Sequence, residues 1–302
     1  MARIMCIGHA VLDYVFSLPD LPSGGRKHRA SAFDCVGGGP AATAAVAIAR
    51  LGGKAARGAR RGADWVADAI ISELEDYGVD CARVRRFAGR ASSLSAVMVD
   101  ARGERMIVNY RDEKMPADAR WIGDASGFDA VLADTRWPEG AAAGFSAART
   151  AKIPAVLDAD DPVPDDPAML GRATHLAFSA DGLEGLTGEK DPARGLKSVR
   201  ARFGAWACVT DGARGVLLCD DDGVSAIGAF DVDPVDTLGA GDVWHGAFAL
   251  ALGDGAAETD AVRFANAAAA IKVTRAGGRK GAPARAEVEA FLTANMEMEP
   301  RF

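Results

Sequence analysis

The sequence lacks the features typical of membrane, secreted and nucleic-acid-binding proteins. No apolar run approaches the length of a membrane span, and the chain enters a strand-like segment, residues 4–8, without the layout of a signal peptide. The net charge is −7, with 42 acidic against 35 basic residues, so the basic excess of a nucleic-acid surface is missing. We therefore expect a cytoplasmic protein with neither a membrane nor a nucleic acid as partner.

Several familiar site motifs are also absent. The five cysteines include no C-x-x-C pair and the four histidines are scattered, which predicts reduced thiols and no zinc site. There is no G-x-x-x-x-G-K-[ST], which excludes a P-loop enzyme, and no G-x-G-x-x-G after the first strand, which disfavours a dinucleotide-binding enzyme. The densest basic run, residues 57–61, is interpreted as a solvated loop.

Short apolar runs alternate with helical segments over most of the 302 residues, which predicts a parallel sheet covered on both faces. Helix 40–51 has Pro40 at its start and glycines at its end, and Asp64 should cap helix 65–77. An antiparallel pair is expected at 215–219 and 225–229, and a frayed end at 296–302. Buried strands are expected at 4–8, 130–133, 155–158, 175–178 and 207–210, and further helices at 140–150, 192–203 and 259–273.

Two stretches interrupt this alternation. Residues 13–35 are rich in Pro and Gly turns, and residues 92–110 alternate in a hairpin pattern. They predict a small β-sheet beside the main domain. We expect a main domain of residues 1–12, 36–91 and 113–302, and a β-sheet lid of residues 13–35 and 92–112.

The most informative segment is Asp236-Thr237-Leu238-Gly239-Ala240-Gly241-Asp242, which runs directly into a helical pattern. Small residues allow close backbone approach, and the first N–H groups of a helix lack internal partners, so this turn can bind phosphate. A carboxylate beside bound phosphate makes sense if Asp242 takes a proton from a hydroxyl that attacks the phosphorus. The alternative is an ordinary capping Asp after a glycine turn.

This D-T-x-G-A-G-D string resembles the signature of the PfkB/ribokinase family of sugar and nucleoside kinases. The resemblance implies a three-layer α/β/α sandwich with a mostly parallel central sheet and a small β-sheet lid, which is often also the surface of a homodimer. It implies ATP and Mg²⁺ as cofactors. It assigns the anion hole to Gly239, Ala240 and Gly241, and the catalytic base to Asp242.

The resemblance extends to the nucleotide side. The string from Val209 to Gly215 resembles the V-T-x-G-x-x-G of the family, so Thr210, Gly212 and Gly215 are expected to line the nucleotide phosphates; a structural hairpin turn is the alternative. Asn266 matches a position near the adenine, or is a polar face residue. Asp236 matches a residue that, with the loop at 275–283, holds a monovalent cation in many members.

One departure affects the expected magnesium network. The family often shows N-x-x-E before an L-T-G, but Ser179 and Gly182 stand at those two positions here. The resemblance therefore implies that the magnesium-water network is altered or assembled differently.

The acceptor side is expected around Asp13, which matches a carboxylate that binds sugar hydroxyls; a surface turn residue is the alternative. The segment 37–44 resembles the G-G-x-x-x-N signature and contributes Gly38, Gly39 and Thr43. Thr43 replaces the Asn that recognises ribose-type sugars in the family, which argues against a simple ribokinase.

Three further polar residues, Lys27, Asn109 and Arg136, are predicted to converge on the sugar pocket, with Arg111 nearby. Two cations suit an anionic substituent on the sugar, whereas surface solvation is the usual fate of Lys and Arg. The strings 37–52, 103–110, 131–137 and 177–188 resemble the sulfofructose kinases, a subgroup that holds a sulfonate with such residues. The resemblance implies phosphorylation of the 1-hydroxyl of 6-deoxy-6-sulfofructose. Alternatives are a kinase of fructose 6-phosphate, tagatose 6-phosphate, a neutral ketose or a nucleoside, and a non-catalytic sugar-binding protein.

Overall fold

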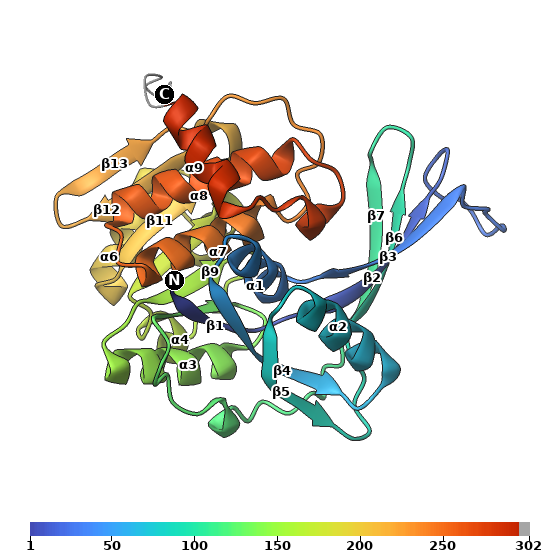
Figure 1. Cartoon of the computed structure of the whole chain (residues 1–302), viewed down its shortest axis with the longest axis horizontal. Coiled ribbons are helices and arrows are strands. Elements are labelled where there is room, and N and C mark those ends of the chain that lie inside the picture. Colours follow the sequence, from blue (N-terminus) through green and yellow to red (C-terminus); the bar gives the residue numbers. More distant parts are fainter. Residues whose placement is uncertain (296–302) are drawn as a thin grey trace.

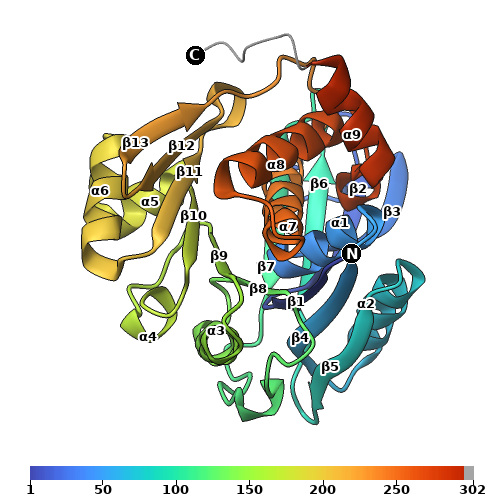
Figure 2. The ribbon, with the colours of Figure 1, turned by 60° about the vertical axis from the view of Figure 1, so that its left-hand side comes forward.

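A nine-stranded sheet runs through the molecule in the computed structural model, which describes residues 1–295; the predicted frayed end, 296–302, lies outside the described residues. The strand order is β13-β12-β11-β10-β9-β8-β1-β4-β5 (Figures 1 and 2). Pairing is parallel from β11 to β5, and β12 is antiparallel to both of its neighbours. The strands are β1 (Arg3–Ile7), β4 (Lys54–Gly62), β5 (Asp80–Phe87), β8 (Ala130–Asp134), β9 (Ala155–Ala159), β10 (His175–Ser179), β11 (Trp206–Thr210), β12 (Val216–Asp220) and β13 (Gly223–Ile227).

Helices cover both faces of this sheet, as the alternating pattern predicts (Figure 2). Two apolar cores result, one on each face. None of the helices in residues 1–295 is both long and apolar enough to cross a membrane. One face carries α1 (Pro40–Arg50), α2 (Trp65–Asp76), α7 (Ala240–Gly253) and α8 (Glu258–Val273), with α9 (Arg285–Ala294) against α8; the other carries α3 (Pro138–Ala151), α4 (Pro167–Leu170), α5 (Ala180–Thr187) and α6 (Pro192–Phe203).

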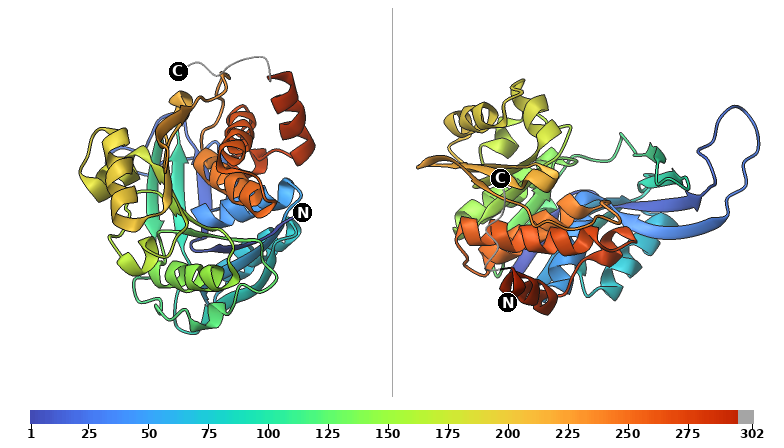
Figure 3. Two further views of the ribbon diagram at one scale, coloured as in Figure 1. Left: turned by 90° about the vertical axis from the view of Figure 1, so that its left-hand side faces the viewer. Right: turned by 90° about the horizontal axis from the view of Figure 1, so that it is seen from above.

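A second sheet of four strands, in the order β3-β2-β6-β7, projects from the body of the molecule (Figures 1 and 3). The pair β2–β6 is parallel and the other two pairs are antiparallel. The α/β fold class with a small separate sheet is thus confirmed, while the residue limits of the two domains stay a prediction. The strands are β2 (Val11–Ser17), β3 (Ala32–Gly38), β6 (Leu94–Val99) and β7 (Arg105–Tyr110).

The interpretation of residues 57–61 as a solvated loop is wrong, because they belong to strand β4 between β1 and β5. The Arg57 side chain is fully buried, and its guanidinium donates to the carbonyl oxygens of Cys6, Gly8 and His9. A buried guanidinium is tolerated when carbonyl oxygens accept from its N–H groups, as they do here from Nη1 and Nη2. The Arg57 guanidinium therefore binds backbone carbonyl oxygens at the carboxyl end of β1 and is not exposed to solvent.

Helices α1 and α7 touch through a glycine. A Cβ on Gly246 would lie 2.6 Å from the carbonyl oxygen of Ala44, so only glycine permits this approach without a shift of one helix. The contact holds the first turns of both helices at the same edge of the large sheet. That edge carries the candidate site.

Candidate active site

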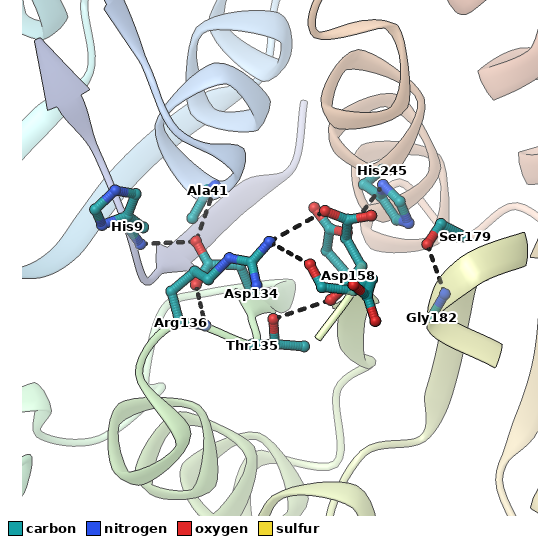
Figure 4. Close-up of polar contacts among 11 residues, drawn as sticks. His9, Ala41, Asp134, Thr135, Arg136, Asp158, Ser179, Gly182 and His245 are labelled. Atoms are coloured by element: carbon teal, nitrogen blue, oxygen red, sulfur yellow. Dashed lines mark hydrogen bonds and ion pairs between the residues drawn. The ribbon is translucent and has the colours of Figure 1, made fainter. Parts of the chain in front are cut away.

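Polar contacts gather where β1, β8, β9 and β10 end and where α1 and α7 begin (Figure 4). The carboxyl ends of parallel strands all lie at one edge of a sheet, which is the usual place for a site in this fold class. Asp134 ends β8, Asp158 lies near the end of β9, and His245 lies in α7. The same edge therefore receives titratable side chains from three separate segments, β8, β9 and α7.

The anion turn, residues 236–242, adopts the geometry that its glycines allow. Gly239 has φ of +73°, a left-handed conformation that favours glycine, and α7 begins at Ala240. The Ala240 N–H donates to the Thr237 carbonyl oxygen at 3.1 Å, so this group is engaged within the turn. Within the described chain, the N–H groups of Gly239 and Gly241 donate no hydrogen bond and remain available to an anion.

Asp242 lies in the first turn of α7 and is partly exposed. Burial raises its pKa to about 7, and the neighbouring carboxylate of Asp158 adds to the rise, while His245 opposes it. An acid with a pKa near neutrality can accept and release a proton at the pH of a cell.

His245 and Asp158 form a buried pair beneath Asp242, and neither was singled out from the sequence. His245 Nδ1 lies 3.5 Å from Asp158 Oδ1 and 2.8 Å from the Gly241 carbonyl oxygen, and Nε2 lies 3.2 Å from the Ala177 carbonyl oxygen. Burial lowers the pKa of His245, and Asp242 and the two carbonyl oxygens act in the opposite direction. Burial and the carboxylate of Asp134 raise the pKa of Asp158. In the sequence, His245 stands within an apolar helical pattern, and nothing in that pattern indicates that it pairs with Asp158.

Asp134 joins three segments of the site, although it was not predicted as a site residue. Its Oδ2 accepts hydrogen bonds from the His9 and Ala41 N–H groups at 2.7 and 3.2 Å, and its Oδ1 accepts one from the Arg136 N–H at 2.9 Å. The carboxylate thus links the end of β1, the first turn of α1 and the loop after β8. The sequence feature that could have pointed to Asp134 is an acidic residue at the end of an apolar strand.

Two residues predicted for the acceptor side, Asp13 and Asn109, belong to a row of polar residues on the small sheet. Asp13 of β2 pairs in register with Ser95 of β6, which pairs with Asn109 of β7. Asn109 Nδ2 donates to Ser95 Oγ at 2.9 Å. Burial raises the pKa of Asp13, and a hydrogen bond with Ser95 opposes the rise. Ser95 was not predicted, because its place in the row depends on strand register.

Glycines and Thr43 connect this row to the anion turn. A Cβ on Gly38 would lie 2.4 Å from Asp13 Oδ2, and one on Gly39, whose φ is +94°, would lie 2.7 Å from Ala10 Cα. On the other side, a Cβ on Gly239 would lie 3.3 Å from Thr43 Cγ2 and 3.7 Å from Asp242 Oδ2. Close contacts through the buried Thr43 therefore connect residues predicted for the acceptor with the anion turn.

The three residues predicted to hold an anionic substituent are not joined. The Arg136 guanidinium donates to Asp160 Oδ2 at 3.2 Å and to the Asp161 carbonyl oxygen at 2.7 Å, both through Nη2. Arg111 donates to the Arg136 carbonyl oxygen at 2.8 Å. Lys27 is exposed in the β2–β3 loop, and within residues 1–295 no hydrogen bond or ion pair joins it to Asn109 or Arg136. The predicted convergence stays a prediction.

The residues predicted for the nucleotide have clear structural contacts. Thr210 Oγ1 donates to the Phe178 carbonyl oxygen at 3.3 Å. Gly212 and Gly215 have positive φ in the β11–β12 turn, where a Cβ on Gly215 would lie 2.3 Å from the Ile227 carbonyl oxygen. Asn266 is buried: its side chain accepts from Trp244 Nε1 at 2.7 Å and donates to the Gly228 carbonyl oxygen at 3.0 Å. The alternative for Asn266, a polar face residue, does not fit this burial.

The departure at Ser179 and Gly182 has a packing explanation. Ser179 caps α5, since its Oγ accepts the Gly182 N–H at 3.1 Å. A Cβ on Gly182 would lie 2.2 Å from the Ala159 carbonyl oxygen, so a glutamate could not enter here without a shift of β9 or α5. The expected magnesium-water ligands are therefore replaced by a tight helix–strand contact.

The fold and the site define a ribokinase-like α/β kinase, and solved structures agree. A structure from Agrobacterium tumefaciens whose ribokinase assignment is provisional superposes with a TM-score of 0.90, at 36% identity and 99% coverage of both chains. A ribokinase from Thermotoga maritima superposes with a TM-score of 0.84, at 26% identity, covering 97% of this chain and 100% of that one.

The chain belongs to the pfkB family of carbohydrate kinases, whose model matches residues 1–285. The ribokinase of Bacillus subtilis is 30% identical over 298 residues, which cover 97% of this chain and 100% of that protein. The protein is therefore an ATP-dependent phosphotransferase with a hydroxyl group as acceptor, a sugar or nucleoside kinase.

We predict that the Asp242→Asn variant is more stable than the wild type at alkaline pH, and that this difference in stability disappears on acidification. The raised pKa means that the folded state binds more protons at Asp242 than the unfolded state between about pH 4 and 7, so wild-type stability falls as pH rises through this window. Because Asp242 is partly exposed, we expect a gain of about 1–2 kcal/mol near pH 8.

Thermal unfolding of the two proteins across this pH range measures the effect. Asp233→Asn, at an exposed aspartate of the preceding loop, is the matched control and should show no such pH dependence. The prediction would be contradicted if the unfolding temperatures of Asp242→Asn and wild type differed by the same amount at acidic and at alkaline pH.

Proposed function

We propose that Asp242 is the catalytic base and that the anion turn holds the transferring phosphoryl group. The observation that carries this proposal is the proximity of Thr43, Gly239 and Asp242, since it joins the acceptor surface to a helix terminus with free N–H groups. Asp242 takes the proton of the acceptor hydroxyl, whose oxygen forms a bond to the γ-phosphorus. The bond from that phosphorus to the bridging oxygen breaks, and ADP leaves with the electron pair.

The Gly239 and Gly241 N–H groups stabilise the charge on the phosphoryl oxygens, with the dipole of α7 behind them. We infer that Thr210, Gly212 and Gly215 line the remaining nucleotide phosphates. Asn266 has both ends of its amide engaged, so we assign it the support of Trp244 and of the Gly228 backbone near the adenine.

Magnesium, when bound, neutralises the β and γ oxygens of the nucleotide. Within residues 1–295 no group of three or more His, Cys, Asp or Glu side chains is arranged to hold a metal ion. The Ser179 and Gly182 contacts leave no carboxylate where the family often has one. We therefore propose that the ion enters with the nucleotide and is held chiefly by phosphate and water.

We propose 6-deoxy-6-sulfofructose as the acceptor, phosphorylated on its 1-hydroxyl. Asp13 would orient the sugar hydroxyls, with Gly38, Gly39 and Thr43 forming the wall toward the anion turn. Arg136, Asn109 and Lys27 would hold the sulfonate. In support, the Nε and Nη1 groups of Arg136 and the Oδ1 of Asn109 make no hydrogen bond within residues 1–295, so they are available to a ligand.

Ribose is the second candidate acceptor, because the B. subtilis relative is named a ribokinase. A neutral sugar does not need Arg136 and Lys27, and Thr43 stands where ribose recognition uses an amide in the family. Fructose 6-phosphate, tagatose 6-phosphate, a neutral ketose and a nucleoside complete the set of acceptors to be compared.

The small sheet is proposed to act as a lid and as the contact surface of a homodimer. Strands β3 and β7 are its edges, and every residue of β7 is exposed. Large apolar side chains stand exposed on these edges, among them Phe33, Ile107, Val108 and Tyr110. Exposed apolar edge strands are uncommon in monomers and are usually covered by a partner.

We predict that Asp242→Asn lowers kcat by about 10²–10⁴-fold, the usual contribution of a general base. In the wild type, kcat/KM should fall about tenfold per pH unit below a midpoint near pH 7, since the base must be ionised. Release of ADP with each candidate acceptor measures both effects. Near-normal turnover by the variant would exclude Asp242 as the base; Asp233→Asn should behave as wild type.

We predict that Arg136→Gln raises KM for sulfofructose about 10–100-fold, as expected for loss of a charge-assisted hydrogen bond. The KM for ATP, and the rate measured with fructose, which lacks the sulfonate, should not change. Arg120→Gln, at an exposed arginine paired with Asp118, is the control. An equal loss with fructose would indicate a structural role through Asp160 and Asp161 instead.

We predict that Val108→Glu converts a dimer into a monomer, because a charge on an exposed edge strand opposes pairing. Sedimentation velocity of wild type and variant tests this. A wild-type protein that remains monomeric at every concentration would contradict the dimer.

A further inference from the structure

The ammonium group of Lys272 is buried beside the anion turn. Lys272 lies near the end of α8, its side chain is 0% exposed, and its Nζ donates to the Asp236 carbonyl oxygen at 2.6 Å. The same Nζ lies 3.6 Å from Asp236 Oδ2. A lysine is almost never fully buried unless it is paired, because removing its charge from water is costly. Such a position therefore indicates a defined role.

The Asp236 carboxylate is surrounded by donors. Its Oδ1 accepts hydrogen bonds from the Leu238 N–H at 2.9 Å and from Arg105 Nη2 at 3.1 Å. Its Oδ2 accepts from the Gly277 and Gly278 N–H groups at 3.1 and 2.9 Å. Burial acts to raise the pKa of Asp236, but the hydrogen bonds from Gly278 and Leu238 and the charges of Lys272 and Arg105 outweigh it and lower the pKa, which holds Asp236 in the ionised form.

The monovalent cation expected at Asp236 and the 275–283 loop does not fit this arrangement. A hard cation needs several oxygen ligands directed at it. Here the carbonyl oxygen of Asp236 faces an ammonium group, and both carboxylate oxygens face N–H groups and a guanidinium. A metal ion placed at these oxygens would be repelled by two side-chain cations and by the positive ends of the N–H dipoles.

We propose that Lys272 is a tethered cation that takes the place of the monovalent ion at Asp236, so that the kinase needs no added potassium or sodium. The Lys272 ammonium links the backbone of Asp236 to α8 through a hydrogen bond. The Asp236 carboxylate links the anion turn to the N–H groups of Gly277 and Gly278 in the same way. Lys272 is thus a positioning residue: it holds the segment that presents Gly239. This inference rests on the proposed role of the anion turn, but its stability test does not.

Two substitutions at Lys272 distinguish the effect of losing the positive charge from the effect of losing the volume of the side chain. Lys272→Ala removes the charge and opens space beside the Asp236 carbonyl oxygen, which a potassium or ammonium ion can enter. Lys272→Met also removes the charge but keeps a long side chain in that space. We expect both variants to unfold at lower temperature than wild type, and only Lys272→Ala to regain thermal stability when potassium or ammonium chloride is added.

The thermal unfolding temperature is measured in chloride salts of potassium, ammonium and tetramethylammonium at equal ionic strength, where tetramethylammonium is too large to enter. Wild type should respond equally to all three salts, and its kinase rate should change by less than about twofold between them. In Lys272→Ala, kcat should recover together with stability.

Wild-type activation or stabilisation by potassium beyond the tetramethylammonium control would overturn the proposal, and this measurement remains decisive if the alanine variant fails to fold. Equal rescue of the alanine and methionine variants would also overturn it, because the ion would then act elsewhere. Because unfolding is measured without substrate, failure of the tethered cation is distinguishable from failure of the assigned acceptor or base.

Discussion

The close approach of helices α1 and α7 is the constraint on which the rest of this site depends. Gly246 allows the Ala44 backbone to lie against α7, and the first turns of the two helices then meet at the carboxyl edge of the sheet. Thr43 consequently lies against Gly239, next to Asp242. In the proposed reaction these two turns align an acceptor hydroxyl with a phosphoryl group, so they must hold a fixed separation, since positioning supplies most of the catalysis in phosphoryl transfer.

Charge balance is the second organising feature. Asp134, Asp158 and Asp242 converge at one edge, and their mutual repulsion together with burial raises the pKa of Asp158 and of Asp242. His245, whose pKa is lowered by burial, lies 3.5 Å from Asp158 Oδ1, and the cation Lys272 lies beside a fourth carboxylate, Asp236. Part of the negative charge is offset by backbone N–H groups, as at Asp134. Of the carboxylates at this edge, Asp242 has its pKa raised to about 7.

Much of the fold could be predicted from local signals. The alternation of apolar runs and helices predicted the covered parallel sheet, and the Asp64 cap is confirmed by its hydrogen bond with the Ala67 N–H. The basic run of β4 was misassigned because local composition does not reveal that Arg57 meets carbonyl oxygens of β1. Asp134, Ser95 and His245 were missed for a related reason: each acquires its partners only through strand register or helix packing.

The sequence by itself determined the family and the anion turn, because a glycine-rich turn before a helix acts through local backbone geometry that short-range residue order specifies. The small sheet was also visible, since a hairpin is a local structure. Only the tertiary structure decided which charges face one another. It placed Lys272 against Asp236 and His245 against Asp158, and it gave Gly182 a contact that excludes a larger side chain. Such pairings join residues far apart in the chain, so their energies depend on burial and distance that no local pattern encodes.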